Sequence, residues 1–143
     1  MFETTSERTL VHTVRMPIRW GDMDAMGHVN NTVYFRYIEQ ARIDWLAAID
    51  CVPDPAKGSG VVIINAHCTF LRQLHYPGDI EVATYVGPIG RSSFETFQEI
   101  RRVDTPHVLV AHGGAKTVWT NYALGKSAPV PDEIRARLLH PTF

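Results

Sequence analysis

A single stretch, at about residues 32–49, carries the pattern of a long helix, and it limits the fold more than any other feature of the chain. Apolar side chains recur there at steps of four, three, four and three residues and so share one stripe: Tyr34, Ile38, Ala41, Trp45 and Ala48. A side-chain oxygen of Asn30 or Asn31 can cap the first turn, and Pro53 and Pro55 follow the last. Such a helix is roughly 27 Å long, which makes it the one element able to fill the concave face of a curved sheet.

Most of the remaining chain has the composition and alternation of β-strands. Strands are predicted at residues 11–19, 61–74, 79–86, 92–103 and 107–122, and a short helix at residues 131–139. The paired glycines Gly113 and Gly114 inside the last strand predict a bulge or a close approach of another backbone. One long helix with about five mostly antiparallel strands is an α+β fold, and its exposed sheet edges favour a dimer.

The composition is that of one folded domain covering residues 1–143. Hydrophobic residues make up 45% and charged residues 20% of the chain, which excludes disorder as its main state. The formal charge of −1 argues against a nucleic-acid partner. No apolar run approaches the ~18 residues that cross a bilayer, so no membrane partner is expected. The first 14 residues lack a signal-peptide pattern and the two cysteines are too few for a disulfide framework, which favours a cytoplasmic location.

The segment at residues 21–27 is rich in turn residues and holds two acids, Asp22 and Asp24. Both acids have an ordinary interpretation as turn formers beside glycine. A calcium loop that starts at Asp22 would need an oxygen ligand at its fifth position and Glu at its twelfth, where this chain has Met26 and Val33. The sequence therefore predicts no calcium site, and from these residues alone both acids keep the interpretation of turn formers.

The sequence carries no pattern for a metal or an organic cofactor, and we expect neither. His107 and His112 are five residues apart on a predicted strand, so they lie on opposite faces and cannot form a ligand pair. No Cys/His cluster has the spacing of a zinc site. Gly58, Ser59 and Gly60 do not form the GxSxG elbow of a serine esterase, and no phosphate-binding glycine loop occurs.

A more specific pattern covers residues 19–42, which read Arg-Trp-Gly-Asp-Met-Asp-Ala-Met-Gly-His-Val-Asn-Asn-Thr-Val-Tyr-Phe-Arg-Tyr-Ile-Glu-Gln-Ala-Arg. This stretch resembles the signature of the hotdog-fold acyl-CoA thioesterases, in particular the 4-hydroxybenzoyl-CoA thioesterase-like group. The resemblance implies a hotdog fold, in which a curved sheet of about five strands wraps round one long helix. It implies an enzyme that hydrolyses an acyl-CoA substrate to a free acid and CoA. It also implies a homodimer, or a dimer of dimers, with the active site at the interface of two subunits.

By this resemblance Asp24 is the catalytic carboxylate, acting as a nucleophile or as a general base. The backbone amide that opens the long helix, near Asn31, polarises the thioester carbonyl. The related acyl-carrier-protein thioesterases share the stretch from His28 to Asn31, but they use an Asn two residues before the His, where this chain has Met26. Two interpretations of His28 therefore stay open: it hydrogen-bonds a loop carbonyl, or it orients the substrate or Asp24.

The resemblance also extends to a Gly-Arg-Ser-Ser segment that binds CoA phosphates in some members of the family. It implies CoA binding by Arg91, with weaker support for Ser92 and Ser93, while Arg91 is equally interpretable as a solvated turn residue. Tyr34 lies on the apolar stripe, and its hydroxyl is a candidate contact in the substrate pocket. Glu39 is a salt-bridge partner in solvent or, if turned into a dimer interface, a second carboxylate.

The chemistry of thioester hydrolysis fits these residue types independently. The reaction needs a group that delivers oxygen to the carbonyl and donors that hold the oxyanion. A carboxylate such as Asp24 can attack directly or deprotonate water, and a helix N-terminus presents free N–H groups and a partial positive charge. Two other functions stay open: a non-catalytic acyl-thioester-binding or scaffold protein of the same fold, and a dehydratase or hydratase, whose His and acid arrangement finds no match here.

Overall fold

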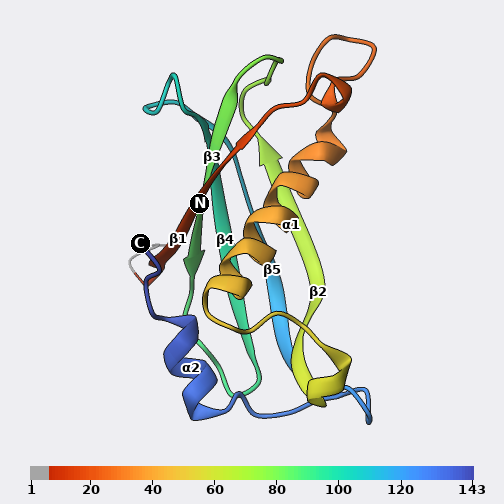
Figure 1. Cartoon of the computed structure of the whole chain (residues 1–143), viewed down its shortest axis with the longest axis vertical. Helices are drawn as coiled ribbons and strands as arrows, with labels where there is room; N and C mark the ends of the chain where they lie inside the picture. Colours follow the sequence, from red (N-terminus) through yellow and green to blue (C-terminus); the bar gives the residue numbers. More distant parts are fainter. Residues whose placement is uncertain (1–6) are drawn as a thin grey trace.

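A curved sheet wraps round one long helix in the computed structural model of this protein, which describes residues 7–143 (Figure 1). The elements are, in chain order, β1 (Thr9–Pro17), the 3₁₀ turn η1 (Trp20–Asp22), α1 (Asn31–Ala48), the 3₁₀ turn η2 (Pro55–Lys57), β2 (Ser59–Phe70), β3 (Asp79–Val86), β4 (Ser93–Arg102), β5 (Leu109–Asn121), β6 (Lys126–Ser127) and α2 (Asp132–Leu138). Residues 1–6 of the predicted domain lie outside the described residues.

The five long strands form one sheet in the order β1-β3-β4-β5-β2, with the short β6 paired to β5. Every pairing between these strands is antiparallel. This is the α+β, hotdog-type arrangement that the sequence predicted, with β1 and β2 as the outer strands of the path. The predicted strand at residues 61–74 ends early, at Phe70. The Leu71 and Arg72 N–H groups both donate to the Val110 carbonyl, so the chain leaves the regular ladder there.

The helix α1 lies along the concave face of the sheet (Figure 1). Six of its side chains are buried: Tyr34, Tyr37, Ile38, Ala41, Trp45 and Leu46. The stripe predicted from the sequence is confirmed except at Ala48, which is exposed in the last turn. An 18-residue helix is thus held by the sheet along most of its length, and its N-terminus is fixed at one end of the sheet.

The glycine pair in β5 marks a close approach of neighbouring backbone and side chains. A Cβ at Gly113 would meet the His67 carbonyl of β2, and it would lie 3.0 Å from the Ile38 Cδ1 of α1. The predicted close approach is therefore confirmed at Gly113. The irregularity in the β2–β5 pairing lies elsewhere, between Ile63 and Asn65.

The core divides into two clusters of buried side chains. One cluster lies under the first half of α1 and includes Tyr34, Tyr37, Ile38, Leu74, Ile80, Val82 and Ile100. The other joins the second half of α1 to α2 and includes Trp45, Leu46, Ile49, Phe94, Trp119, Ile134 and Leu138. Within residues 7–143, no helix combines the length and the apolar content that crossing a membrane requires.

Candidate active site

The loop at residues 22–30 connects η1 to α1 and folds back on itself. Met23 and Val29 form an antiparallel bridge, and the Asp24 N–H donates to the His28 carbonyl at 2.8 Å. The Gly27 N–H donates to the Asp24 carbonyl at 3.0 Å, and Gly27 has a φ of 77°, a left-handed conformation that glycine adopts without strain. The glycine therefore closes the tight turn that projects the Asp24 side chain.

The Asp24 carboxylate is exposed and only partly engaged by the protein. Its Oδ1 accepts the Met26 N–H at 2.9 Å, which is the turn-forming bond expected of an aspartate at this place. Among residues 7–143, no donor contacts its Oδ2. The ordinary and the functional interpretations of Asp24 are thus compatible, because one oxygen shapes the turn and the other stays available to a reactant.

The first turn of α1 leaves one backbone donor free beside this carboxylate. Asn30 caps the helix, since its Oδ1 accepts the Thr32 N–H at 2.9 Å and its carbonyl accepts the Val33 N–H at 2.9 Å. In the described part of the chain, the Asn31 N–H has no hydrogen-bond acceptor. It stands at the positive end of the helix dipole, where it can donate to a negatively charged oxygen.

A pocket of about 460 Å³ brings four of the predicted site residues together: Asp24, His28, Asn31 and Tyr34. Its other walls are Val29 and the end of β2 with the segment that follows, namely Phe70, Leu71, Arg72 and Gln73. A volume of this size falls in the range of small-molecule sites in proteins. The pocket therefore brings together Asp24, the residue that carries the free backbone amide, and apolar side chains.

Tyr34 and His28 shape the inside of this pocket. The Tyr34 side chain is buried, its hydroxyl donates to the Arg72 carbonyl at 3.3 Å, and its ring meets the edge of Phe70 at 5.0 Å between centroids. Burial raises the pKa of Tyr34, so its hydroxyl stays a neutral donor. The His28 ring packs edge-on against His75 at 4.9 Å. It is the His75 Nδ1 that donates to a loop carbonyl, that of Gly27, at 3.1 Å.

The predicted CoA-binding residues lie far from this pocket within one chain. Arg91 and Ser92 lie in the turn between β3 and β4 and Ser93 begins β4, and the Gly90 N–H donates to the Ser93 carbonyl at 2.8 Å. The Arg135 guanidinium of α2 donates to the Gly90 carbonyl at 2.9 Å, which holds α2 against this turn. Figure 1 shows α2 at the opposite end of the sheet from the start of α1. A single chain thus brings Asp24, His28, Asn31 and Tyr34 together but leaves this segment apart.

Sequence reasoning missed the segment after β2 as part of the site. Phe70 to Gln73 reach the pocket because β2 runs beside β5 and ends next to the first turn of α1. Neither spacing nor residue type distinguishes this segment from an ordinary strand end. Within residues 7–143 the Arg72 guanidinium has no carboxylate within ion-pair distance, so it is a positive charge free to meet an anion.

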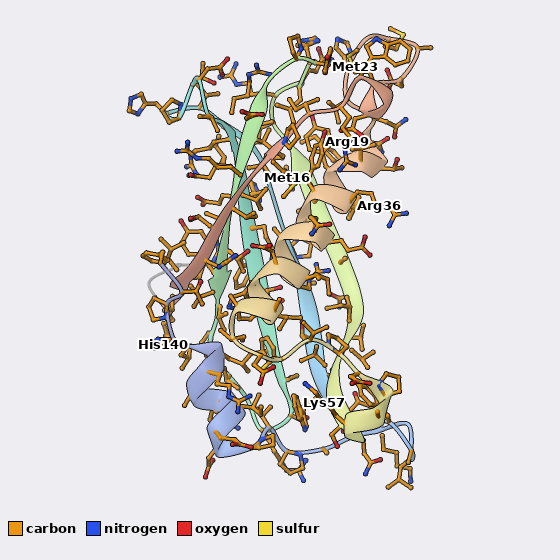
Figure 2. All side chains as sticks on the ribbon, in the orientation of Figure 1. Met16, Arg19, Met23, Arg36, Lys57 and His140 are labelled. Carbon is orange, nitrogen blue, oxygen red and sulfur yellow. The ribbon has the colours of Figure 1, made fainter. Side chains whose placement is uncertain are left out.

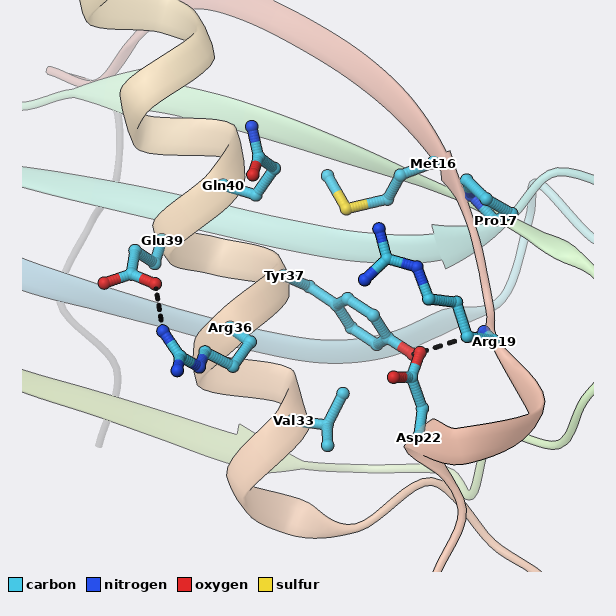
Figure 3. Close-up of a pocket in the computed structure, with 9 residues that line it drawn as sticks. All are labelled: Met16, Pro17, Arg19, Asp22, Val33, Arg36, Tyr37, Glu39 and Gln40. Atoms are coloured by element: carbon cyan, nitrogen blue, oxygen red, sulfur yellow. Dashed lines mark hydrogen bonds and ion pairs between the residues drawn. The ribbon is translucent and has the colours of Figure 1, made fainter.

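A second cavity, of about 440 Å³, lies between the end of β1 and the first turns of α1 (Figure 3). Asp22 and Tyr37 join across it, and Arg19 lines it from the β1 side. Glu39 also lies here, exposed and paired with Arg36 at 2.9 Å, and Figure 2 shows Arg36 on the outer side of the helix. Within one chain Glu39 is thus a salt-bridge partner, one of its two expected roles.

The residues that the structure describes include no group of three metal-ligating side chains close enough to hold an ion.

Comparison with known proteins identifies the family of the chain. A family model described as the thioesterase-like superfamily matches residues 18–138. The chain is also similar to a solved structure from Pseudomonas aeruginosa, of a protein for which a thioesterase function has been suggested. The two share 37% sequence identity and a TM-score of 0.82, over 91% of this chain and 99% of the other.

Two further similarities agree with this match. A curated relative from Aquifex aeolicus, named as a suggested esterase, is 29% identical over 108 residues, which cover 69% of this chain and 84% of the relative. The structure of a 1,4-dihydroxy-2-naphthoyl-CoA thioesterase from Synechocystis has a TM-score of 0.79 and 18% identity, over 88% of this chain and 93% of that one. At this low identity the second similarity supports the fold alone.

Proposed function

The chain belongs to the thioesterase-like superfamily, and from that premise we propose that it hydrolyses an acyl-CoA thioester to a free acid and CoA. One observation carries the proposal: a single pocket of about 460 Å³ is lined by both Asp24 and Asn31, the residue whose N–H has no acceptor within residues 7–143. A thioester carbonyl held in this pocket would meet an oxygen nucleophile or base on one side and an oxyanion donor on the other.

Asp24 delivers oxygen to the carbonyl in one of two ways. In the first, its free carboxylate oxygen attacks the acyl carbon, the carbon–sulfur bond breaks, and CoA leaves as the thiolate. The resulting mixed anhydride is then hydrolysed by water, which restores the carboxylate. In the second, the carboxylate takes a proton from a water molecule whose oxygen attacks the acyl carbon, and the proton passes to the departing thiolate. The exposed Oδ2 of Asp24 suits either route.

The Asn31 N–H holds the negative charge that develops on the carbonyl oxygen. Its lack of an acceptor within residues 7–143 and its position at the start of an 18-residue helix both support this role. A single oxyanion donor is typically worth about 10²–10³ in rate. Because the donor is a backbone amide, substitution of the Asn31 side chain leaves it in place.

His28 and Tyr34 orient the substrate around the reacting carbonyl. Both line the pocket, and the hydrogen bond from Tyr34 to Arg72 keeps the far wall fixed. Phe70 and Leu71 give that wall an apolar surface suited to an acyl group, while the Arg72 charge suits the anionic CoA. The pocket thus has an apolar side for the acyl group and a cationic side for CoA.

The proposed active unit is a homodimer, or a dimer of dimers, built through β2. This strand is an outer strand of 12 residues, and its exposed large apolar side chains are Val62, Ile63, Ile64 and Phe70. An outer strand of this length with unpaired backbone groups is suited to antiparallel pairing with its own copy. A two-fold axis across β2 would bring the α2 end of one subunit, with its Arg91 turn, toward the Asp24 end of the other.

The proposal is tested with Asp24→Asn, which keeps the size of the side chain and the turn-forming oxygen but removes the charge. We expect kcat on the best substrate of a panel of benzoyl-, hexanoyl- and palmitoyl-CoA to fall by at least about 10²-fold, with KM changed by less than about threefold. The assay is release of free CoA thiol, followed with a thiol-reactive dye. Asp132→Asn, at an exposed position in the first turn of α2, is the matched control and should retain full activity.

Two results would contradict the proposal. Unchanged hydrolysis by Asp24→Asn would remove the carboxylate from the mechanism. Binding of every acyl-CoA without turnover by the wild-type protein would favour the acyl-thioester-binding scaffold instead. Hydrolysis of hexanoyl-CoA, whose saturated chain offers no double bond to hydrate, would separate a thioesterase from a hydratase.

A further inference from the structure

Asp22, the first acid of the loop, joins three separate parts of the molecule. Its Oδ2 accepts the Arg19 N–H at 2.9 Å and the Tyr37 hydroxyl at 2.7 Å. Its backbone carbonyl accepts the Asn30 N–H at 3.0 Å. One residue thus ties the segment after β1, the cap of α1 and the second turn of α1 together. Figure 3 shows Asp22 beside Arg19 and Tyr37. A solvated turn residue would make only the first of these contacts.

Tyr37 gives this junction a rigid anchor. Its side chain is 5% exposed, within the buried cluster under the first half of α1, and its ring meets Tyr34 at 6.3 Å between centroids. Burial, together with the hydrogen bond to the Asp22 carboxylate, raises the pKa of Tyr37. The hydroxyl therefore remains protonated at neutral pH, and it donates to Asp22.

The loop transmits the position of Asp22 to Asp24. Its two sides are bridged at Met23 and Val29, and the Asp24 N–H is bonded to the His28 carbonyl, so residues 22–30 form one hydrogen-bonded unit. The unit contacts the sheet side through the Val29 N–H, which donates to the Leu74 carbonyl at 2.9 Å. Among the side chains of α1 in the described chain, only Tyr37 hydrogen-bonds to this unit beyond its own cap.

The cavity beside this bond determines how the loop responds when the bond is lost. About 440 Å³ of space lies against Asp22 and Tyr37, lined also by Met16, Val33 and Gln40 (Figure 3). Among residues 7–143, the Arg19 N–H would be the one donor left on the Asp22 carboxylate. Without the Tyr37 hydroxyl, the carboxylate and the loop attached to it gain room to shift relative to the helix.

We propose that Tyr37 is a positioning residue, which acts through the Asp22 carboxylate to hold the loop so that Asp24 and the Asn31 N–H face the same thioester carbonyl group. This inference rests on the proposed function, in which Asp24 is the reacting carboxylate. Tyr37 lines the second cavity and not the Asp24 pocket, so its effect on the reaction passes through the loop. A displacement of about 1 Å at a reacting group can cost as much as about 10²-fold in rate.

The test is Tyr37→Phe in the full chain, which removes the hydroxyl and keeps the ring in the core. We expect kcat to fall about tenfold, KM to stay within about twofold, and Tm to fall by less than about 5 °C. Backbone hydrogen exchange at residues 22–30 should become faster, while exchange in β3 and β4 should not change. The matched control is Tyr85→Phe, which removes another tyrosine–carboxylate bond, to Glu99 at 3.4 Å, on strands away from the site.

Two variants of Asp22 complete a double-mutant cycle with Tyr37→Phe. Asp22→Asn keeps an oxygen that accepts from Tyr37 and should retain most of kcat, whereas Asp22→Ala should lose about as much as Tyr37→Phe. If both act through one bond, the double variant Asp22→Ala with Tyr37→Phe should be no slower than either single variant. Multiplied losses in the double variant would overturn the proposal, because they would indicate two independent effects.

The failure of this inference can be told apart from failure of the proposed function. Wild-type kcat in Tyr37→Phe, measured beside an inactive Asp24→Asn, would remove the positioning role and leave the function intact. Hydrolysis by Asp24→Asn would overturn the proposed function, and with it the reason for positioning that carboxylate. A fall in Tm that matches the loss of activity, with kcat per folded molecule unchanged, would reduce Tyr37 to a structural role and overturn the inference.

Discussion

The two ends of the sheet are held together by different forces. At the Asp24 end, residues 24–27 are exposed, and backbone hydrogen bonds within the loop fix their shape. At the α2 end, Ile134 and Leu138 are buried against Trp45 and the strands beneath it. The Asp24 end leaves an N–H and a carboxylate oxygen available to a ligand, whereas the α2 end is closed by apolar packing.

This difference separates reactivity from stability within one small fold. Groups that are to meet a substrate must keep free hydrogen-bonding capacity, so they contribute little to folding. Buried apolar side chains contribute most of the folding free energy and take no part in chemistry. Substitutions at the α2 end should therefore change the free energy of unfolding, and those at the Asp24 end should change kcat.

The largest expected effect on folding is at Leu138, in the last turn of α2, whose side chain is 0% exposed. Leu138→Ala should lower the free energy of unfolding by about 2–4 kcal/mol, because it leaves a cavity in the cluster that joins α2 to α1. We expect kcat per folded molecule to stay at the wild-type value. Urea unfolding followed by tryptophan fluorescence measures the first quantity, and thiol release at a temperature well below Tm measures the second.

The neighbouring residue supplies the control for this prediction. Leu139 is 41% exposed, and Leu139→Ala should change the free energy of unfolding by less than about 0.5 kcal/mol. If Leu138→Ala lowered kcat in fully folded protein, the two ends would be coupled, and the division between them would be wrong.

An intermediate effect is expected at Asn30, the cap of α1. Asn30→Asp keeps an oxygen for the Thr32 N–H and adds a negative charge at the positive end of the helix, so stability should change by less than about 0.5 kcal/mol. The same charge lies one residue from the Asn31 N–H and opposes a developing oxyanion. We expect kcat to fall about tenfold, measured with the same thioester substrate.

A second variant at the same position separates the loss of the cap from the added charge. Asn30→Ala removes the cap without adding charge, and it should lower the free energy of unfolding by about 1 kcal/mol with a smaller loss of kcat. An Asn30→Asp protein with wild-type kcat would show that the helix N-terminus does not hold the oxyanion.

The fold could be predicted from the sequence because its strongest signals are local. The helix pattern at residues 32–49 corresponds to α1 at Asn31–Ala48, and the alternation at residues 79–86 corresponds to β3 at the same residues. The resemblance of residues 19–42 to a known family predicted that the sheet wraps round the helix. The order of the strands depends on the whole chain, and it was not predicted. The early end of β2 at Phe70 was missed, because two N–H groups share one carbonyl there without any sign in the sequence.

The site was predictable where its residues are neighbours in the chain. Asp24, His28, Asn31 and Tyr34 lie within 11 residues, and one loop and one helical turn bring them to a single pocket. Arg72 reaches the same pocket only through the pairing of β2 with β5, and the bond between Asp22 and Tyr37 spans 15 residues. Contacts of this kind depend on the direction of side chains in three dimensions, which neither residue type nor spacing specifies.

The smallest expected effect is a change in KM at two arginines, which lie at opposite ends of the sheet and would meet CoA from two subunits. Arg72 lines the Asp24 pocket, and Arg91 lies in the turn beside α2. If both guanidinium groups contact CoA phosphates in a dimer built through β2, then Arg72→Ala and Arg91→Ala should each raise KM about fivefold at low salt and leave kcat unchanged. Both increases should shrink at about 0.5 M salt, because screening weakens exposed charge pairs.

Arg15→Ala is the control for general loss of positive charge, since Arg15 is exposed and paired with Glu81 on β3, away from both sites. It should leave KM unchanged at either salt concentration. A change in KM for Arg72→Ala alone would confine CoA binding to the Asp24 end of one chain. Equal changes for both arginines would require the α2 end of a second chain at the pocket, since one chain holds the two residues at opposite ends of the sheet.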